Sequence, residues 1–201
     1  MRQRGFSLIE LMVTIVILLL LILAAVPSIG TWLDNTRIRN EGDSIINGLQ
    51  TARAEAVRRN QNVSFWLVKL NDPATLSNDC SLLSTSGSWM VSIFDPVNQC
   101  AADATSTDAT VNPSGVIAGR PMGADSTRVS VTAKQSDGSS SVLVTFNGFG
   151  RVANPASITS IDLAGIGGGT YRNLRVLVSK TGAVRLCDPA VTSSTDPRKC
   201  T

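Results

Sequence analysis

The chain has 201 residues, 43% of them hydrophobic, which suits one globular domain with a buried core and an appended segment. It contains no histidine, so the side chain most often used as a general base near neutral pH and as a metal ligand is absent. The formal net charge of +3 is too small to indicate a nucleic-acid-binding protein by charge alone.

The N-terminus combines a basic start with a long apolar run. Arg2 and Arg4 precede the apolar residues 6–26, which would span about 30 Å as a helix and so match a bilayer core. The positive-inside tendency then leaves the N-terminus in the cytoplasm and the rest of the chain outside it. A cleaved signal peptide and a simple single-pass anchor are two alternatives. Neither explains Glu10, because a carboxylate in an apolar segment is costly and needs a partner.

The residues around this carboxylate resemble a known processing site. Gly5-Phe6-Ser7-Leu8-Ile9-Glu10 is similar to the site in type IV prepilins and in the pseudopilins of type II secretion. The resemblance implies that prepilin peptidase cuts between Gly5 and Phe6 and that Phe6 is then N-methylated. It also implies that Glu10 pairs with the Phe6 amine of a neighbouring subunit during assembly, and that Pro27 kinks the helix.

From residue 28 to about residue 60 the helical rhythm continues. Ile45, Leu49, Ala52 and Ala56 follow the spacing i, i+4, i+7 and i+11, which places them on one face. Glu55 has an arginine four residues later, as expected on an exposed flank. The pattern predicts an amphipathic helix whose apolar face packs on a sheet.

The period changes after residue 62, and short runs rich in β-branched and aromatic residues follow. Residues 95–113 are expected to form a surface loop, Asp137-Gly138 a turn, and residues 165–169 a flexible connection. This order predicts an α+β fold, with a long N-terminal helix packed on an antiparallel sheet. The expected strands are residues 63–68, 89–94, 129–133, 142–146, 158–163, 174–179 and 183–187.

The four cysteines belong to no Cys-x-x-Cys pair, which excludes zinc-ribbon and thioredoxin-like sites. An even number beyond a membrane segment favours two disulfides in an oxidising compartment. Three connectivities are possible, and Cys80–Cys100 with Cys187–Cys200 is the simplest. Four free thiols in a cytosolic protein are the alternative.

Interior segments carry a second resemblance. The helix at residues 48–60, Ser88-Trp89-Met90-Val91, the segment at residues 146–151 and the last strand at residues 182–187 are similar to the GspH/FimT group of minor pilins and pseudopilins. With the N-terminus, this resemblance covers most of the chain. It implies a prepilin leader at residues 1–5, a transmembrane and assembly helix at 6–29, its amphipathic continuation at 30–62, and a β-rich periplasmic domain at 63–201.

The resemblance implies a structural subunit and not an enzyme. The expected function is that of a minor pilin in the tip or initiation complex of a type IV pilus, anchored in the bacterial inner membrane. The alternative is a pseudopilin of type II secretion. Its partners would be other pilins or pseudopilins and prepilin peptidase. No catalytic constellation, cofactor or metal site is expected, because histidine, Cys-x-x-Cys pairs and a phosphate-binding glycine loop are all missing.

DNA binding is a third possibility. Some FimT-like minor pilins bind DNA through a C-terminal Gly-Arg-x-Arg motif, and the matching positions here start at Gly182 and end at Arg185. Ala183 replaces the first arginine, so half of the motif is missing. Lys180, Arg198 and Lys199 are further candidate phosphate contacts. The alternative is that these cations are solvated and discourage pairing at the edge of the sheet.

Overall fold

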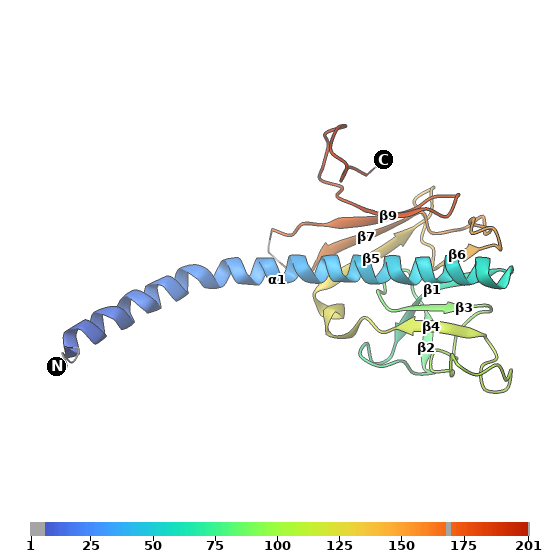
Figure 1. Cartoon of the computed structure of the whole chain (residues 1–201), viewed down its shortest axis with the longest axis horizontal. Helices are drawn as coiled ribbons and strands as arrows, with labels where there is room; N and C mark the ends of the chain where they lie inside the picture. The colour runs from blue at the N-terminus through green and yellow to red at the C-terminus, as the bar shows by residue number, and fades with distance from the viewer. Residues whose placement is uncertain (1–6, 168–169, 201) are drawn as a thin grey trace, which may run out of the picture.

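The computed structural model describes residues 7–167 and 170–200, with the side chains of residues 23–29, 124 and 126 left out of that description. One long helix lies along two small antiparallel sheets, and its N-terminal half projects beyond them (Figure 1). The elements are α1 (Leu8–Arg59), β1 (Val63–Leu70), β2 (Cys80–Leu82), β3 (Trp89–Ser92), β4 (Val116–Arg120), the 3-10 helix η1 (Gly123–Thr127), β5 (Val129–Lys134), β6 (Leu143–Phe146), β7 (Ser160–Gly165), β8 (Leu174–Val178) and β9 (Val184–Cys187).

The helix α1 has 52 residues and is therefore about 78 Å long. Ser7 caps its start, since the Ser7 hydroxyl accepts a hydrogen bond from the Glu10 backbone N–H at 3.3 Å. Asn60 ends it in the left-handed conformation, with a φ of 49°. The helix continues through position 27 without interruption, and the kink at Pro27 stays a prediction.

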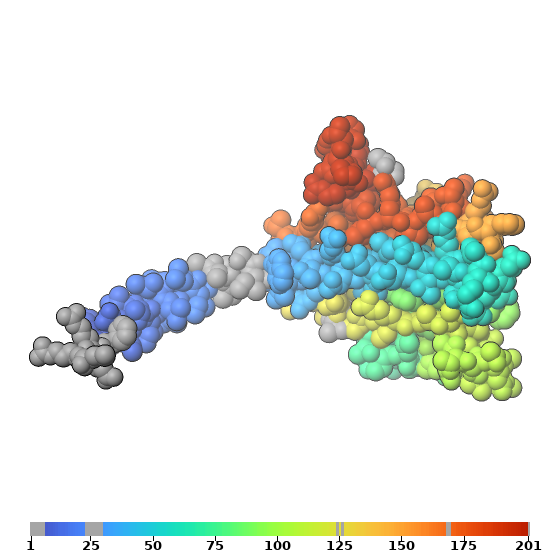
Figure 2. Space-filling view, in the orientation of Figure 1, coloured from blue at the N-terminus to red at the C-terminus, as the bar shows by residue number. Residues whose placement is uncertain are grey.

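The two halves of α1 have different surroundings. From residue 31 onward one side of the helix is covered by the sheets, whereas residues 7–22 are exposed throughout and stand clear of the body (Figure 2). Over the residues described, no helix has the length and hydropathy expected of a membrane-crossing segment.

The first sheet has the strand order β2-β1-β3-β4, with β6 also paired to β1, on the edge opposite β3, and the second has the order β5-β7-β8-β9. All pairings between these strands are antiparallel. The α+β class with a helix packed on antiparallel structure is thus as predicted. The expected strands are all present, but they divide between two sheets, and β2 and β4 were not expected. Asp137 and Gly138 form the predicted turn between β5 and β6, with a φ of 87° at Gly138.

The main core lies between α1 and the two sheets. Ile45, Leu49, Ala52 and Ala56 are fully buried there, which confirms the predicted apolar face. Glu55 also forms the predicted ion pair, with 2.8 Å between its Oε2 and Arg59 Nε.

Two glycines let α1 approach both sheets closely. A Cβ atom at Gly42 would lie 3.0 Å from side chains of β7 and β9, and one at Gly48 would lie 2.7 Å from the Phe65 ring of β1. Because they face different sheets, the helix packs against both rather than resting on one.

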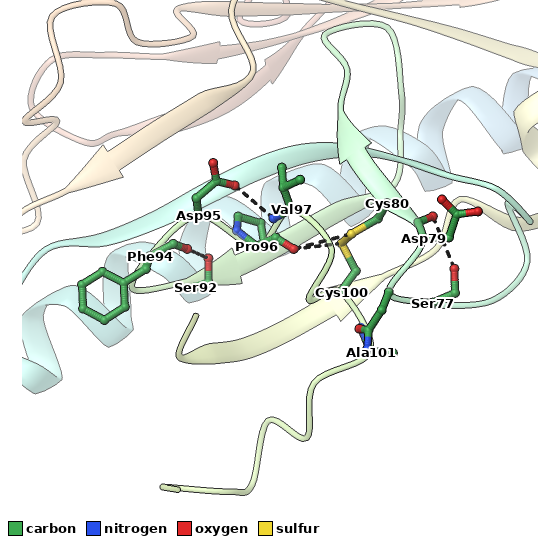
Figure 3. Close-up of a disulfide and its surroundings, with 11 residues drawn as sticks. Ser77, Asp79, Cys80, Ser92, Phe94, Asp95, Pro96, Val97, Cys100 and Ala101 are labelled. Atoms are coloured by element: carbon green, nitrogen blue, oxygen red, sulfur yellow. Dashed lines mark hydrogen bonds between the residues drawn. A yellow bond between two sulfur atoms is a disulfide. The ribbon is translucent and has the colours of Figure 1, made fainter. Parts of the chain in front are cut away.

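A second, smaller core covers the other face of the first sheet. It includes Val68, Leu70 and Met90, and the disulfide between Cys80 and Cys100 closes it (Figure 3). The Pro96 carbonyl oxygen lies 3.5 Å from Cys80 Sγ, so the loop after β3 folds back over the bond. β1 is consequently buried on both faces, which explains its nearly continuous apolar sequence.

Candidate functional site

The predicted processing and assembly residues lie at the start of α1. Gly5 and Phe6 fall outside the described residues. Glu10 is in the first turn of the helix, where the helix dipole favours a carboxylate. Its side chain is exposed, and within residues 7–167 and 170–200 no hydrogen bond or ion pair of this carboxylate is found. The predicted intermolecular role of Glu10 therefore remains a prediction.

The apolar side chains that follow Glu10 surround the helix instead of forming a stripe. From Leu8, which is 78% exposed, to Ile22, which is 49% exposed, the large hydrophobic residues of this half are all accessible. A helix that is apolar on every side requires an apolar environment around it. The described part of this chain does not supply one, so these side chains lie uncovered in the structure.

A groove of about 400 Å³ separates the middle of α1 from the β8–β9 side of the second sheet. Leu174 and Leu186 contribute apolar lining, and Trp32 on α1 is 66% exposed beside them. The charges of the rim are mixed: Arg172 Nε lies 2.8 Å from Asp188 Oδ2. The groove is therefore partly apolar and not a simple anion-binding site.

The predicted DNA contacts do not gather in one place. Lys180 lies in the β8–β9 turn, whereas Arg198 and Lys199 lie beyond β9, in the C-terminal loop that the Cys187–Cys200 disulfide closes. That loop projects from the body (Figure 2). Arg185 on β9 donates a hydrogen bond of 3.3 Å from Nη2 to the Lys199 carbonyl, which links those two positions.

Several C-terminal cations are already paired with carboxylates. Arg198 binds Asp196 through two hydrogen bonds, of 2.6 and 3.0 Å, and this interaction lowers the pKa of the Asp196 carboxyl to about 2. Arg175 pairs with Asp162 across β7 and β8. Each such pair removes positive charge that a phosphate backbone would need. DNA binding through these residues stays a prediction, and the ion pairs count against it.

Three of the segments with GspH/FimT-like sequence meet beside the C-terminal part of α1. Arg53 Nε donates a hydrogen bond of 3.0 Å to the Gly150 carbonyl oxygen. Gly182, with a φ of 82°, lies so close to the same carbonyl that an added Cβ would collide with it. These residues thus join α1, the β6–β7 loop and the β8–β9 turn. The two glycines have a packing role at this junction.

Glu41 is a buried carboxylate that sequence reasoning missed. It is 3% exposed, and its Oε1 has no hydrogen-bond partner among the described residues. Burial raises the pKa of the Glu41 carboxyl to about 7; nearby Asp125 also raises it, and Arg120 lowers it. The signal was present in the sequence, because Glu41 lies three residues after Ile38 and four before Ile45, on the apolar face of the helix.

A family model described as prokaryotic N-terminal methylation motif matches residues 1–26. The type IV minor pilin FimU of Pseudomonas aeruginosa strain PAO1 resembles the chain in two crystal forms, with TM-scores of 0.48 and 0.45 at 15% and 14% identity. The matches cover 81% and 78% of this chain and 97% of FimU in both. No curated protein matches the chain.

A second family model covers most of the chain. It is described as type II transport protein GspH and matches residues 41–182, from the buried half of α1 to the β8–β9 turn. Because this match spans well over half of the sequence, the chain belongs to the GspH family of pilin-like proteins.

Proposed function

We propose that the protein is a minor pilin that acts as a structural subunit at the tip or in the initiation complex of a type IV pilus. The observation that carries the proposal is the combination of a prepilin-like N-terminus with a helix half whose apolar side chains are exposed on all sides. Such a surface is stable only when lipid or neighbouring helices cover it. Residues 6–29 are proposed to anchor the subunit in the inner membrane before assembly, with the domain at 63–201 in the periplasm.

The first test of this proposal is the processing of the N-terminus. Removal of the leader at 1–5 should leave a mature chain that begins with N-methylated Phe6. Mass spectrometry of the protein purified from its host membrane would detect this N-terminus directly. A mature chain that begins at Met1 or within residues 23–29 would exclude a prepilin.

The second test is the substitution of Glu10. Glu10→Ala should leave membrane insertion intact, since a costly carboxylate is removed from an apolar segment. It should impair incorporation into filaments, because the amine of a neighbouring Phe6 loses its partner. Glu55→Ala, which removes a partly buried carboxylate within the domain, is the matched control. Normal incorporation of the Glu10 variant would refute the pairing role.

A pseudopilin of type II secretion is the second candidate, and the GspH description of the matching family favours it. The two machines give different phenotypes. Deletion of the gene should abolish surface pili if the subunit starts a pilus, and should abolish secretion of exported enzymes if it belongs to a pseudopilus. Complementation with the wild-type chain and with Glu10→Ala would connect either phenotype to assembly.

A further inference from the structure

The turn after β6 presents an exposed aromatic side chain on a fixed backbone. Phe149 is 85% exposed, more than the other aromatic residues described as exposed, Trp32 and Phe94. The Asn147 side-chain oxygen accepts hydrogen bonds from the Phe149 N–H at 3.0 Å and from the Arg151 N–H at 3.1 Å. The Asn147 N–H donates to the Arg151 carbonyl at 2.9 Å, which closes the turn.

This turn is also held from outside. A Cβ at Gly148 would collide with Asn60, the residue that ends α1, so the turn lies directly on the helix end. The Gly150 carbonyl receives the Arg53 hydrogen bond described above, and Gly182 packs against the same group. Because the backbone beneath Phe149 is already fixed, binding would not have to order this turn, which favours a role as an interface anchor.

The turn that carries Phe149 has one exposed apolar residue and three exposed cations nearby. Val57 is 52% exposed and lies next to Gly150. Arg53 and Arg151 are exposed, and so is Lys180, whose carbonyl accepts a hydrogen bond from the Val152 N–H. Among the residues described, none of these three cations forms an ion pair with a carboxylate. We call the five residues Arg53, Val57, Phe149, Arg151 and Lys180 the distal knob.

The distal knob lies at the end of α1 that points away from the projecting half (Figure 1). If the subunit is anchored by its N-terminus, as the proposed function requires, this end faces away from the membrane. In a tip or initiation complex of several subunits, it is the end that a more distal subunit would meet.

We propose that the distal knob docks into an apolar pocket with an acidic rim on another subunit that carries the same N-terminal methylation motif. Phe149 fills the pocket, and the three cations face the carboxylates of the rim. The charge of the knob favours an acidic partner over a second copy of its own cationic surface. A protein partner is favoured over a nucleic acid strand, because strand-binding surfaces stack successive bases on several aromatic residues and this turn offers one.

The test is a titration of the full chain in detergent against each of the other methylation-motif proteins of the host, purified in the same way. Phe149→Ala should weaken binding to one of them at least about tenfold, as expected for a central aromatic anchor. Phe149→Tyr should restore most of the affinity. Arg151→Glu should weaken binding and remove part of its salt dependence. Ile166→Ala, which trims an exposed apolar side chain after β7, should change nothing and serves as the control.

Each other outcome overturns the proposal. Equal affinity of the wild type and Phe149→Ala for every partner, with unchanged melting of the variant, would show that the knob is not an interface. Binding to no methylation-motif protein, or Phe149-dependent binding only to a second copy or to single-stranded DNA, would do the same. The proposed function fails separately: it depends on the mature N-terminus at Phe6 and on Glu10, which Phe149→Ala leaves untouched.

Discussion

The two halves of α1 share one secondary structure but differ in what stabilises them. Residues 38–56 place an apolar face into a core that the same chain completes, with Ile45 and Leu49 fully buried. Residues 8–22 expose large hydrophobic side chains on every side, and Leu18 is 57% accessible. The C-terminal half is therefore specified by intramolecular packing, whereas the N-terminal half requires an environment from outside the domain. An uninterrupted helix can thus serve two purposes along its length.

The difference between the two halves is tested most directly by truncating one leucine in each. Leu49→Ala should lower the free energy of unfolding by about 2–5 kcal/mol, because it leaves a cavity in a packed core. Leu18→Ala should change it by no more than about 0.5 kcal/mol. Urea unfolding of the full chain in detergent, followed by tryptophan fluorescence, measures both. Similar losses would mean that the projecting half also contributes to the folded domain.

The junction beside the C-terminal part of α1 offers a second contrast. Gly182→Ala should destabilise the protein by about 3 kcal/mol, because the added Cβ collides with the Gly150 carbonyl at a positive φ. Gly138→Ala is the matched control: its φ is 87°, but nothing lies within 4 Å of an added Cβ, so only the backbone cost of about 1–2 kcal/mol applies. Equal effects in the same unfolding assay would show that the contact of the two glycine segments is unimportant.

Glu41 makes the buried half sensitive to pH. Its pKa of about 7 in the folded state exceeds the ordinary 4.5, so the folded protein holds the proton more tightly than the unfolded chain. Stability should fall as pH rises from about 4.5 to 7, by up to roughly 3 kcal/mol, and then level off. Glu41→Gln should remove this slope and raise the stability at pH 8. Melting temperatures between pH 4 and 8 would measure it, and an identical slope in the variant would assign the effect to other groups.

The ion pairs of the partly buried Glu55 on α1 should give the smallest effect. Arg58 lies 2.7 Å from Glu55 and lowers the pKa of this carboxyl, together with Arg59. Glu55→Ala should nevertheless cost less than about 1 kcal/mol, because the pair is near the surface. The contribution should disappear as pH falls through the depressed pKa of Glu55, the reverse of the trend for Glu41. Unfolding at low and high salt would measure it, and a larger loss that is insensitive to salt would indicate a role in packing.

Local patterns predicted most of the fold. The helical face and the strands rich in valine and phenylalanine were recognisable because both features follow from periodicity. β2 was missed because three residues in a segment rich in serine and asparagine carry no period. β4 was missed because Gly119 interrupts the apolar pattern of its sequence. The structure gives the reason for this glycine: a Cβ at position 119 would collide with the Met90 side chain. The division into two sheets depends on contacts between distant strands, which no local pattern encodes.

The candidate sites were less predictable. Counting cations near the C-terminus gave no sign that Arg198 is paired with Asp196, because the pairing depends on how the loop folds. The burial of Glu41 could have been inferred from its place on the apolar face. The exposure of Phe149 could not, because an aromatic residue between two glycines is equally consistent with a buried turn.

The packing of α1 against both sheets also has a mechanical consequence. The helix contacts strands of both sheets along its buried half, and its N-terminal half extends beyond the domain (Figure 1). A tensile force on this projecting half is directed along the helix axis, so it loads the core in shear and is shared by both sheets. Extraction of the helix would require the contacts of many side chains to rupture together, and the domain is therefore built to withstand being pulled by its N-terminus.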